Sequence, residues 1–91
     1  MSAAPSAEIK RMTLRSWRRG MKEMDLVLGP FAEAHLGAME DAARHRYDLL
    51  LSENDPEIFA WITGAAEVPA RYAALIGQIR AFARSARRPG G

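Results

Sequence analysis

The sequence contains no cysteine and only two histidines, His35 and His45. Without cysteine the chain has no disulfide framework, no thiolate zinc site and no thiol nucleophile. Two histidines are fewer than the three or four ligands that a histidine-built zinc site uses. We therefore predict no metal site, and these absences favour a binding or helper module over a self-contained enzyme.

Long apolar stretches and an export signal are also missing. A membrane-spanning helix needs about 20 consecutive apolar residues, and no uncharged run in the chain reaches that length. Residues 1–9 lack the basic flank and apolar stretch of a secretory signal. We expect a cytoplasmic protein without membrane contact.

Patterns for nucleotide binding and catalysis are absent as well. The seven glycines have neither Rossmann nor P-loop spacing, and no Ser-His-Asp set is evident. His45 lies between Arg44 and Arg46 and is expected on the surface. His35 lies on a partly apolar stripe and is expected to be half-buried. No catalytic residue is predicted.

Charge is unevenly distributed, although the net charge is only +2. Residues 1–24 hold six basic and two acidic side chains, residues 25–67 hold two basic and nine acidic ones, and residues 68–91 hold five arginines and no acid. This pattern fits simple solvation of helix faces, or separate basic and acidic faces that orient a protein partner. Nucleic acid is not expected as a partner, because the acidic middle would repel phosphates.

Apolar residues recur with the period of helices, and no segment alternates with the period of a strand. We predict an all-α fold, a single compact five-helix bundle. The domain organisation expected is a flexible N-terminal arm over residues 1–6, a helical domain over 7–84 and a basic flexible tail over 85–91. The helices expected are residues 7–19, 22–38, 40–51, a short helix ending at Gly64, and a last helix opened by Pro69.

Several residues indicate where these helices begin and end. Ser6 is expected to cap the first helix, and Gly20 to end it in the left-handed conformation. Pro30, which follows Gly29, predicts a kink or a break in the second helix. Asp55 is expected to cap the short fourth helix, with Pro56 at its first position.

The helical spacing also predicts which side chains point inward. Trp17 and Trp61 are expected in the core or at its edge rather than as stacking platforms for a base or a flavin. The inner positions are Ile9, Met12, Thr13 and Trp17; Met24, Val27, Leu28, Phe31 and His35; Ala43, Tyr47, Leu50 and Leu51; Ile58, Phe59, Trp61 and Ile62; and Tyr72, Leu75, Ile76, Ile79, Phe82 and Ala83.

The junction between the first two helices reads Arg18-Arg19-Gly20-Met21-Lys22-Glu23-Met24-Asp25. Basic residues at a helix end, a glycine turn and acidic residues in the next first turn are all explained by helix capping. A glycine between a basic and an acidic group also offers a place where another protein's backbone can approach closely. Both interpretations stay open on these residues alone.

This junction resembles the Arg-Gly-x-x-Glu-x-Asp signature of the SdhE-type succinate dehydrogenase flavinylation factors. A second stretch, Leu50-Leu51-Ser52-Glu53-Asn54-Asp55-Pro56-Glu57-Ile58-Phe59-Ala60-Trp61-Ile62, is similar to the family's Leu-Leu-x-x-x-Asp-x-Asp-Leu-x-x-Trp-Leu segment. The resemblance covers about residues 14–78. One departure is Glu57, which stands where the family has its second aspartate.

The resemblance implies an assembly factor that promotes covalent attachment of FAD to the flavoprotein subunit of succinate dehydrogenase, and it leaves fumarate reductase open as a further client. It implies a non-catalytic monomer that binds and orients the flavoprotein, with FAD held by that partner and not stably by this chain. The partner-binding residues expected are Arg18, Arg19, Gly20, Met21, Glu23 and Asp25. The alternatives are a helical interaction module with another client and, more weakly, a nucleic-acid-binding helical domain.

Overall fold

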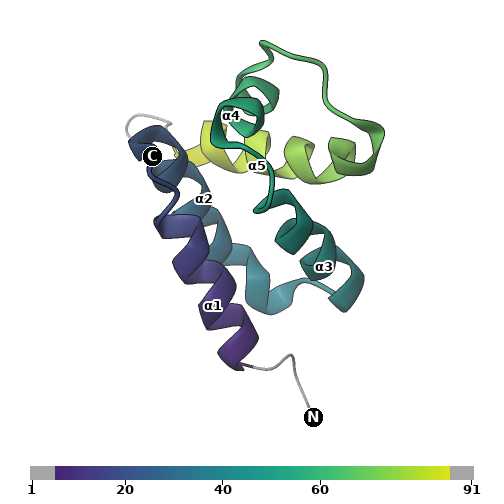
Figure 1. The fold of residues 1–91 in the computed structure, drawn as a ribbon. Coiled ribbons are helices and arrows are strands. Elements are labelled where there is room, and N and C mark those ends of the chain that lie inside the picture. The colour runs from purple at the N-terminus through teal and green to yellow at the C-terminus, as the bar shows by residue number, and fades with distance from the viewer. Residues whose placement is uncertain (1–5, 87–91) are drawn as a thin grey trace.

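The computed structural model describes residues 6–86, and within this range it holds five α-helices, two short 3₁₀ helices and no strand (Figure 1). The all-α five-helix prediction is therefore confirmed. Residues 1–5 of the expected arm and 87–91 of the expected tail lie outside the described range. The elements in chain order are α1 (Ser6–Trp17), α2 (Lys22–His35), η1 (Leu36–Ala38), α3 (Asp41–Leu50), α4 (Asp55–Thr63), η2 (Ala70–Tyr72) and α5 (Ala73–Ala86).

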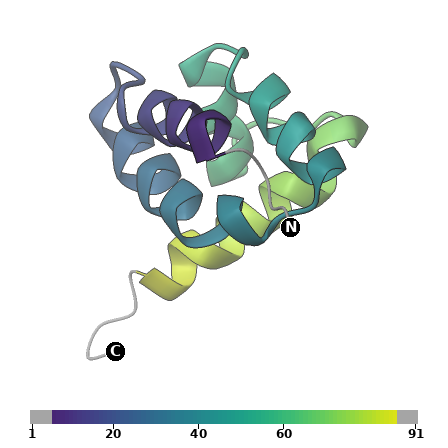
Figure 2. The ribbon, with the colours of Figure 1, turned by 90° about the horizontal axis from the view of Figure 1, so that it is seen from below.

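The first two helices form an antiparallel pair, and the remaining helices pack around it (Figures 1 and 2). Helix α5 contacts α2, α3 and α4. It crosses the molecule so that its C-terminal part lies against α2, where the ring of Phe82 packs edge-on against Phe31 with centroids 5.7 Å apart. Two sequence-distant segments, α2 and α5, therefore share one side of the bundle.

All five helices contribute to one hydrophobic core. Removing these apolar side chains from water supplies the main driving force for folding a chain of this size. The buried apolar residues are Met12, Met24, Leu28, Phe31, Ala32, Leu36, Tyr47, Leu50, Leu51, Ile58, Trp61, Tyr72, Leu75, Ile76 and Ile79.

A small polar network lies inside this core. The hydroxyl of Ser16 is 2.6 Å from that of Tyr47, and Ser16 also donates to the Met12 carbonyl at 2.8 Å. Ser16 is fully buried, and buried polar groups need partners of this kind. The network joins α1 to α3.

Of the kink or break predicted at Pro30, the break is wrong, because α2 runs unbroken from Lys22 to His35. Its buried residues lie on both sides of the proline, with Met24 before it and Phe31 after it. This packing holds the helix together past the missing N–H. The α-helix ends at His35, and residues 36–38, which were expected to continue it, form a tighter 3₁₀ turn.

The inner face of α3 also differs from the prediction. Ala43 is exposed, and its neighbour Arg44 is buried. The Arg44 guanidinium donates to the carbonyls of Leu36 and Met39, which closes the end of η1. A long basic side chain is buried here because it satisfies backbone carbonyls that helical spacing alone does not reveal.

Three predicted helix ends shift. Ser6 is the first residue of α1 rather than its cap, and α1 stops at Trp17. Pro69 precedes the short η2, and α5 begins only at Ala73. Gly20 has the predicted left-handed conformation with φ of +92°, although α1 already stops at Trp17, and the fourth helix stops at Gly64 as predicted, with φ of +86°.

Several predicted inner residues are less buried than expected, and Phe59 and His35 are two of them. Phe59 is only partly buried against the core, whereas Trp61 in the same helix is 7 % exposed. His35 is exposed, although its ring packs 4.7 Å from that of Phe31. Trp17 lies at the core edge, where its indole N–H donates to Glu33 at 2.9 Å.

Candidate functional site

Arg19 turns inward and ties the α1–α2 junction to the turn between α3 and α4. Its Nε donates to Asp55 Oδ1 at 2.8 Å, and its other nitrogens donate to the carbonyls of Leu51 at 2.6 Å and Glu53 at 3.1 Å. Its backbone N–H donates to Asp25 at 2.8 Å. The two sequence stretches singled out above therefore meet in space at one guanidinium.

This contact also explains why Asp55 does not cap α4. Asn54 is the N-cap residue, and Asp55 is the first residue of the helix. The Asp55 carboxylate is occupied by Arg19, and only 16 % of its side chain is exposed. The prediction of Asp55 as a cap is wrong because a long-range ion pair takes the carboxylate instead.

Gly20 follows Arg19 at the surface of the junction. Its φ of +92° is a conformation that residues with a side chain rarely adopt. No atom lies within 4 Å of the place where a Cβ would stand. The backbone is therefore accessible from outside, as the predicted contact with another protein requires.

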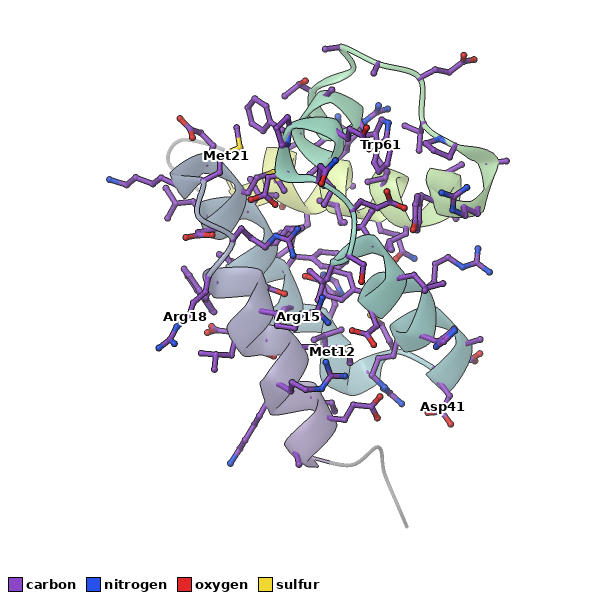
Figure 3. The ribbon with its side chains drawn as sticks, viewed as in Figure 1. Met12, Arg15, Arg18, Met21, Asp41 and Trp61 are labelled. Carbon is purple, nitrogen blue, oxygen red and sulfur yellow. The ribbon has the colours of Figure 1, made fainter. Side chains whose placement is uncertain are left out.

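The remaining residues of the expected partner-binding set divide between inside and outside. Met21 packs partly against the core, and Asp25 is half-buried with its carboxylate on the Arg19 N–H. Arg18 and Glu23 are exposed, and Arg18 points away from the bundle (Figure 3). We call Arg18, Gly20 and Glu23 the outward junction residues, and Arg19 with Asp25 the inward ones.

Glu23 also borders a groove that sequence reasoning missed. One face of α2 forms a wall of this groove, and the side chains of α4 and α5 complete it, enclosing about 440 Å³. The only sequence signal was Leu26, an apolar residue off the inner stripe, which is 59 % exposed. The groove residues are Glu23, Leu26, Val27, Pro30, Phe59, Ile62, Thr63, Phe82 and Ala83.

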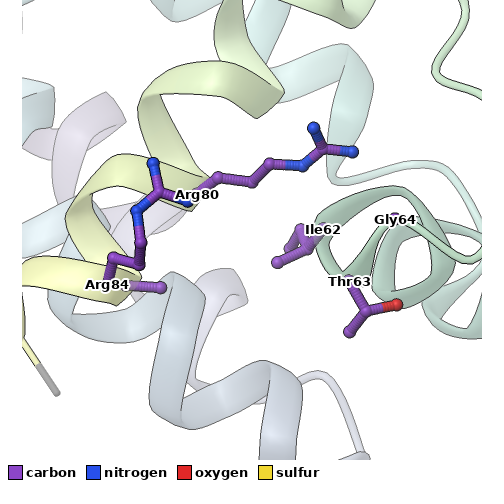
Figure 4. A pocket seen from close by; sticks show the side chains of 6 residues that line it. Ile62, Thr63, Gly64, Arg80 and Arg84 are labelled. Atoms are coloured by element: carbon purple, nitrogen blue, oxygen red, sulfur yellow. The ribbon is translucent and has the colours of Figure 1, made fainter.

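A second hollow of about 410 Å³ adjoins this groove and shares Ile62, Thr63 and Ala83 with it. Figure 4 shows Arg80 and Arg84 of α5 beside the end of α4. Arg80 Nε donates to the Trp61 carbonyl at 3.1 Å, so this guanidinium caps the last turn of α4. Arg84 is exposed.

Separate basic and acidic faces, one of the two interpretations of the charge pattern, do not hold between α1 and α3. Arg15 pairs with Asp48 at 2.8 Å, and Arg11 lies 3.5 Å from the same carboxylate. Exposed pairs of this kind contribute little to stability. They do neutralise part of the basic face of α1.

Metal and membrane features are not found among residues 6–86. No group of three or more histidine, aspartate or glutamate side chains in that range could hold a metal ion. No helix there is long and apolar enough to cross a membrane. His45 is exposed, as predicted.

Comparison with known proteins adds independent findings. A family model described as the flavinator of succinate dehydrogenase matches residues 10–83. A succinate dehydrogenase assembly factor 2, mitochondrial, from Dictyostelium discoideum is 41 % identical over 63 residues, which are 69 % of this chain and 45 % of that protein. Its counterpart from Mycosarcoma maydis is 39 % identical over 72 residues, 79 % of this chain and 30 % of that protein.

A bacterial relative matches over nearly its whole length. The FAD assembly factor SdhE of Haemophilus ducreyi is 35 % identical over 78 residues, which are 82 % of this chain and 94 % of that protein. The chain thus spans less than half the length of the two mitochondrial relatives above. The family match includes both stretches that meet at Arg19.

Proposed function

The chain belongs to the family of the flavinator of succinate dehydrogenase, and from this premise we propose that it promotes covalent attachment of FAD to the flavoprotein subunit of that enzyme. It does so as an assembly factor that binds the flavoprotein, which we call the client. Fumarate reductase is a second client to be tested in the same way.

The observation that supports this function is the division of the junction into inward and outward residues. Arg19 fixes the backbone by bonding to the α3–α4 turn, and this leaves Gly20 and Glu23 at the surface. A surface held in one geometry loses little conformational entropy when it binds a partner. The outward junction residues therefore suit recognition of a folded protein.

The chemistry itself is assigned to the client. The client would hold the FAD and supply the residue to which it becomes attached, and this chain would contribute no atom to the bond. Holding reactive groups in a productive arrangement can supply a large share of a rate enhancement. The role proposed for this chain is to orient the client, with no nucleophile or general base of its own, acting as a monomer in the cytoplasm.

The test is a reconstitution from purified components. The client lacking covalent flavin is incubated with FAD, with and without this chain, and covalent flavin is followed by fluorescence of the denatured client band. The chain should raise the rate or the final yield of the fluorescent band. Equal rates and yields with and without the chain would contradict the proposed function.

A further inference from the structure

The groove beside Glu23 leaves apolar side chains of α2 in contact with water. Glu23, Leu26, Val27 and Pro30 line it at the spacing of one helix face. Leu26 is 59 % exposed, whereas Met24, Leu28 and Phe31 of the same helix are buried in the core. An apolar surface of this kind, bordered by charged residues, is typical of an interaction site.

An acidic side chain lines the groove, and a basic one lines the hollow beside it. Glu23 stands on its α2 wall, and Arg84 belongs to the adjoining hollow that shares Ile62 and Thr63 with it. Neither charge forms an ion pair with another residue of the range 6–86. A complementary segment would be apolar in its middle, with a basic side chain toward Glu23 and an acidic one toward Arg84.

Glu23 belongs both to the outward junction residues and to the groove wall. A protein held at Glu23 therefore also covers the apolar side chains next to it on α2. The volume of about 440 Å³ accommodates a few apolar side chains of a segment. This continuity identifies the client, rather than an unrelated ligand, as the occupant that fits best.

We propose that the groove between α2, α4 and α5 receives an apolar segment of the flavoprotein client, with a basic side chain of that segment against Glu23. The proposal rests on the proposed function, because the occupant is the client of that function. It adds a second contact region to the junction, and it assigns Leu26 as the main apolar contact.

Leu26→Glu tests the groove, and Leu49→Glu is the matched control. Both leucines are exposed helix residues, at 59 % and 44 %, and Leu49 of α3 lines neither the groove nor the hollow beside it. The affinity of each variant for the purified client is measured by titration calorimetry, after the melting temperatures have been compared. Leu26→Glu should weaken binding about tenfold or more, while Leu49→Glu should stay within about twofold of the wild type.

Two further variants keep the result interpretable. Leu26→Ala retains a good helix former and should weaken binding severalfold even if Leu26→Glu melts early. Glu23→Lys reverses the charge at the groove and should also weaken binding, with a loss that shrinks at high salt. Unchanged affinity of Leu26→Ala and Leu26→Glu would overturn the groove proposal.

The outcomes separate the two proposals. If the wild-type chain does not bind the client at all, the proposed function fails. If it binds and accelerates flavin attachment but Leu26 and Leu49 variants behave alike, only the groove proposal fails. Sedimentation that shows a wild-type dimer abolished by Leu26→Glu, with client affinity unchanged, would assign the groove to a second copy and overturn the proposal.

Discussion

Arg19 shows how a residue expected to bind a partner can serve the fold. Its side chain is 9 % exposed and its partner Asp55 16 % exposed, so their ion pair is largely shielded from water. Removing one member leaves the other charge buried without its partner, which typically costs about 3–5 kcal/mol when burial is complete. We predict that Arg19→Ala lowers the free energy of unfolding by about 2 kcal/mol or more.

A double-mutant cycle isolates this pair. Arg19→Ala, Asp55→Ala and the double variant are compared by urea unfolding. A coupling energy of about 1–3 kcal/mol is expected, because the two side chains touch directly. If the losses of unfolding free energy in the two single variants add up to the loss in the double variant, the ion pair contributes nothing. The guanidinium would then stabilise the fold only through its bonds to the Leu51 and Glu53 carbonyls.

Tyr47 gives a prediction for alkaline pH. Burial raises the pKa of Tyr47 to about 12 from the ordinary value of 10, against the opposing effects of Ser16 and nearby arginines. The folded state therefore keeps the proton while the unfolded state loses it. The stability contributed by Tyr47 is complete below pH 10 and is lost as the pH rises to 12, at up to about 1.4 kcal/mol per pH unit.

Tyr47→Phe is the control for this effect. The variant loses the bond to Ser16 and should be about 1 kcal/mol less stable at pH 8. Urea unfolding at pH 8 and pH 11 should show the wild-type advantage shrinking at the higher pH. Burial also raises the pKa of Tyr72. Tyr72 is present in both the wild type and Tyr47→Phe, so its effect on stability cancels in the comparison. A wild-type advantage that is independent of pH would argue against a shifted Tyr47.

The sequence could not distinguish the inward from the outward members of the junction. Capping chemistry and partner contact predict the same residue types at Arg19 and Glu23. Their separation depends on Asp55, which lies 36 positions after Arg19. Helical periodicity describes faces of one helix, and it carries no information about which turn a neighbouring helix brings alongside.

Helix α2 provides a prediction about packing between elements. A Cβ added at Gly29 would stand 2.3 Å from the Trp17 ring, so the indole of α1 lies directly on the α2 backbone. Gly77 of α5 has no atom within 4 Å of such a Cβ. We predict that Gly29→Ala lowers the melting temperature despite the better helix propensity of alanine, because the indole must move.

Gly77→Ala is the matched change. The same substitution in an open helix position should stabilise the protein by about 0.5–1 kcal/mol. Thermal melts followed by circular dichroism measure both variants. If Gly29→Ala melts as high as Gly77→Ala, the close contact between Trp17 and α2 is wrong.

Local signals predicted some helix ends and missed others. Gly20 has the expected positive φ although α1 stops at Trp17, and Gly64 ends α4 with a positive φ, because a left-handed residue is a local requirement that glycine meets. The break predicted at Pro30 is absent because burial of Met24, Leu28 and Phe31 around it offsets the cost of one lost hydrogen bond. That burial depends on tertiary contacts.

For the whole molecule, five helices and one core followed from apolar periodicity, but the groove did not. Its walls come from α2, α4 and α5, and no segment of the sequence contains more than a part of it. Phe59 was expected in the core because it lies on the apolar face of its helix. The spacing within that helix does not show that the neighbouring helices leave Phe59 partly uncovered. A groove formed by three helices can be predicted only once the packing of those helices is known.

The assignment of FAD to the client leads to a prediction for the isolated chain. Residues 6–86 contain no glycine-rich loop arranged to hold a pyrophosphate. Titration calorimetry of the chain with FAD should therefore show no saturable binding in the low-micromolar range. A stoichiometric complex of that affinity would contradict this assignment, because this protein would then bind FAD itself.

The most direct test of recognition at the junction compares Glu23→Ala with Glu8→Ala. Both glutamates are exposed and lie in the first turn of a helix, so each loss costs only about 0.3–1 kcal/mol. Glu8 lies outside the residues that the family model matches. It therefore controls for charge and helix effects.

The measurement is covalent flavin on the client, read by fluorescence of the denatured band at matched protein levels. Glu23→Ala should melt within a few degrees of the wild type and leave much less covalent flavin, while Glu8→Ala should support normal attachment. Near-normal attachment with Glu23→Ala would contradict recognition through the outward junction residues and return Glu23 to a role in helix stability.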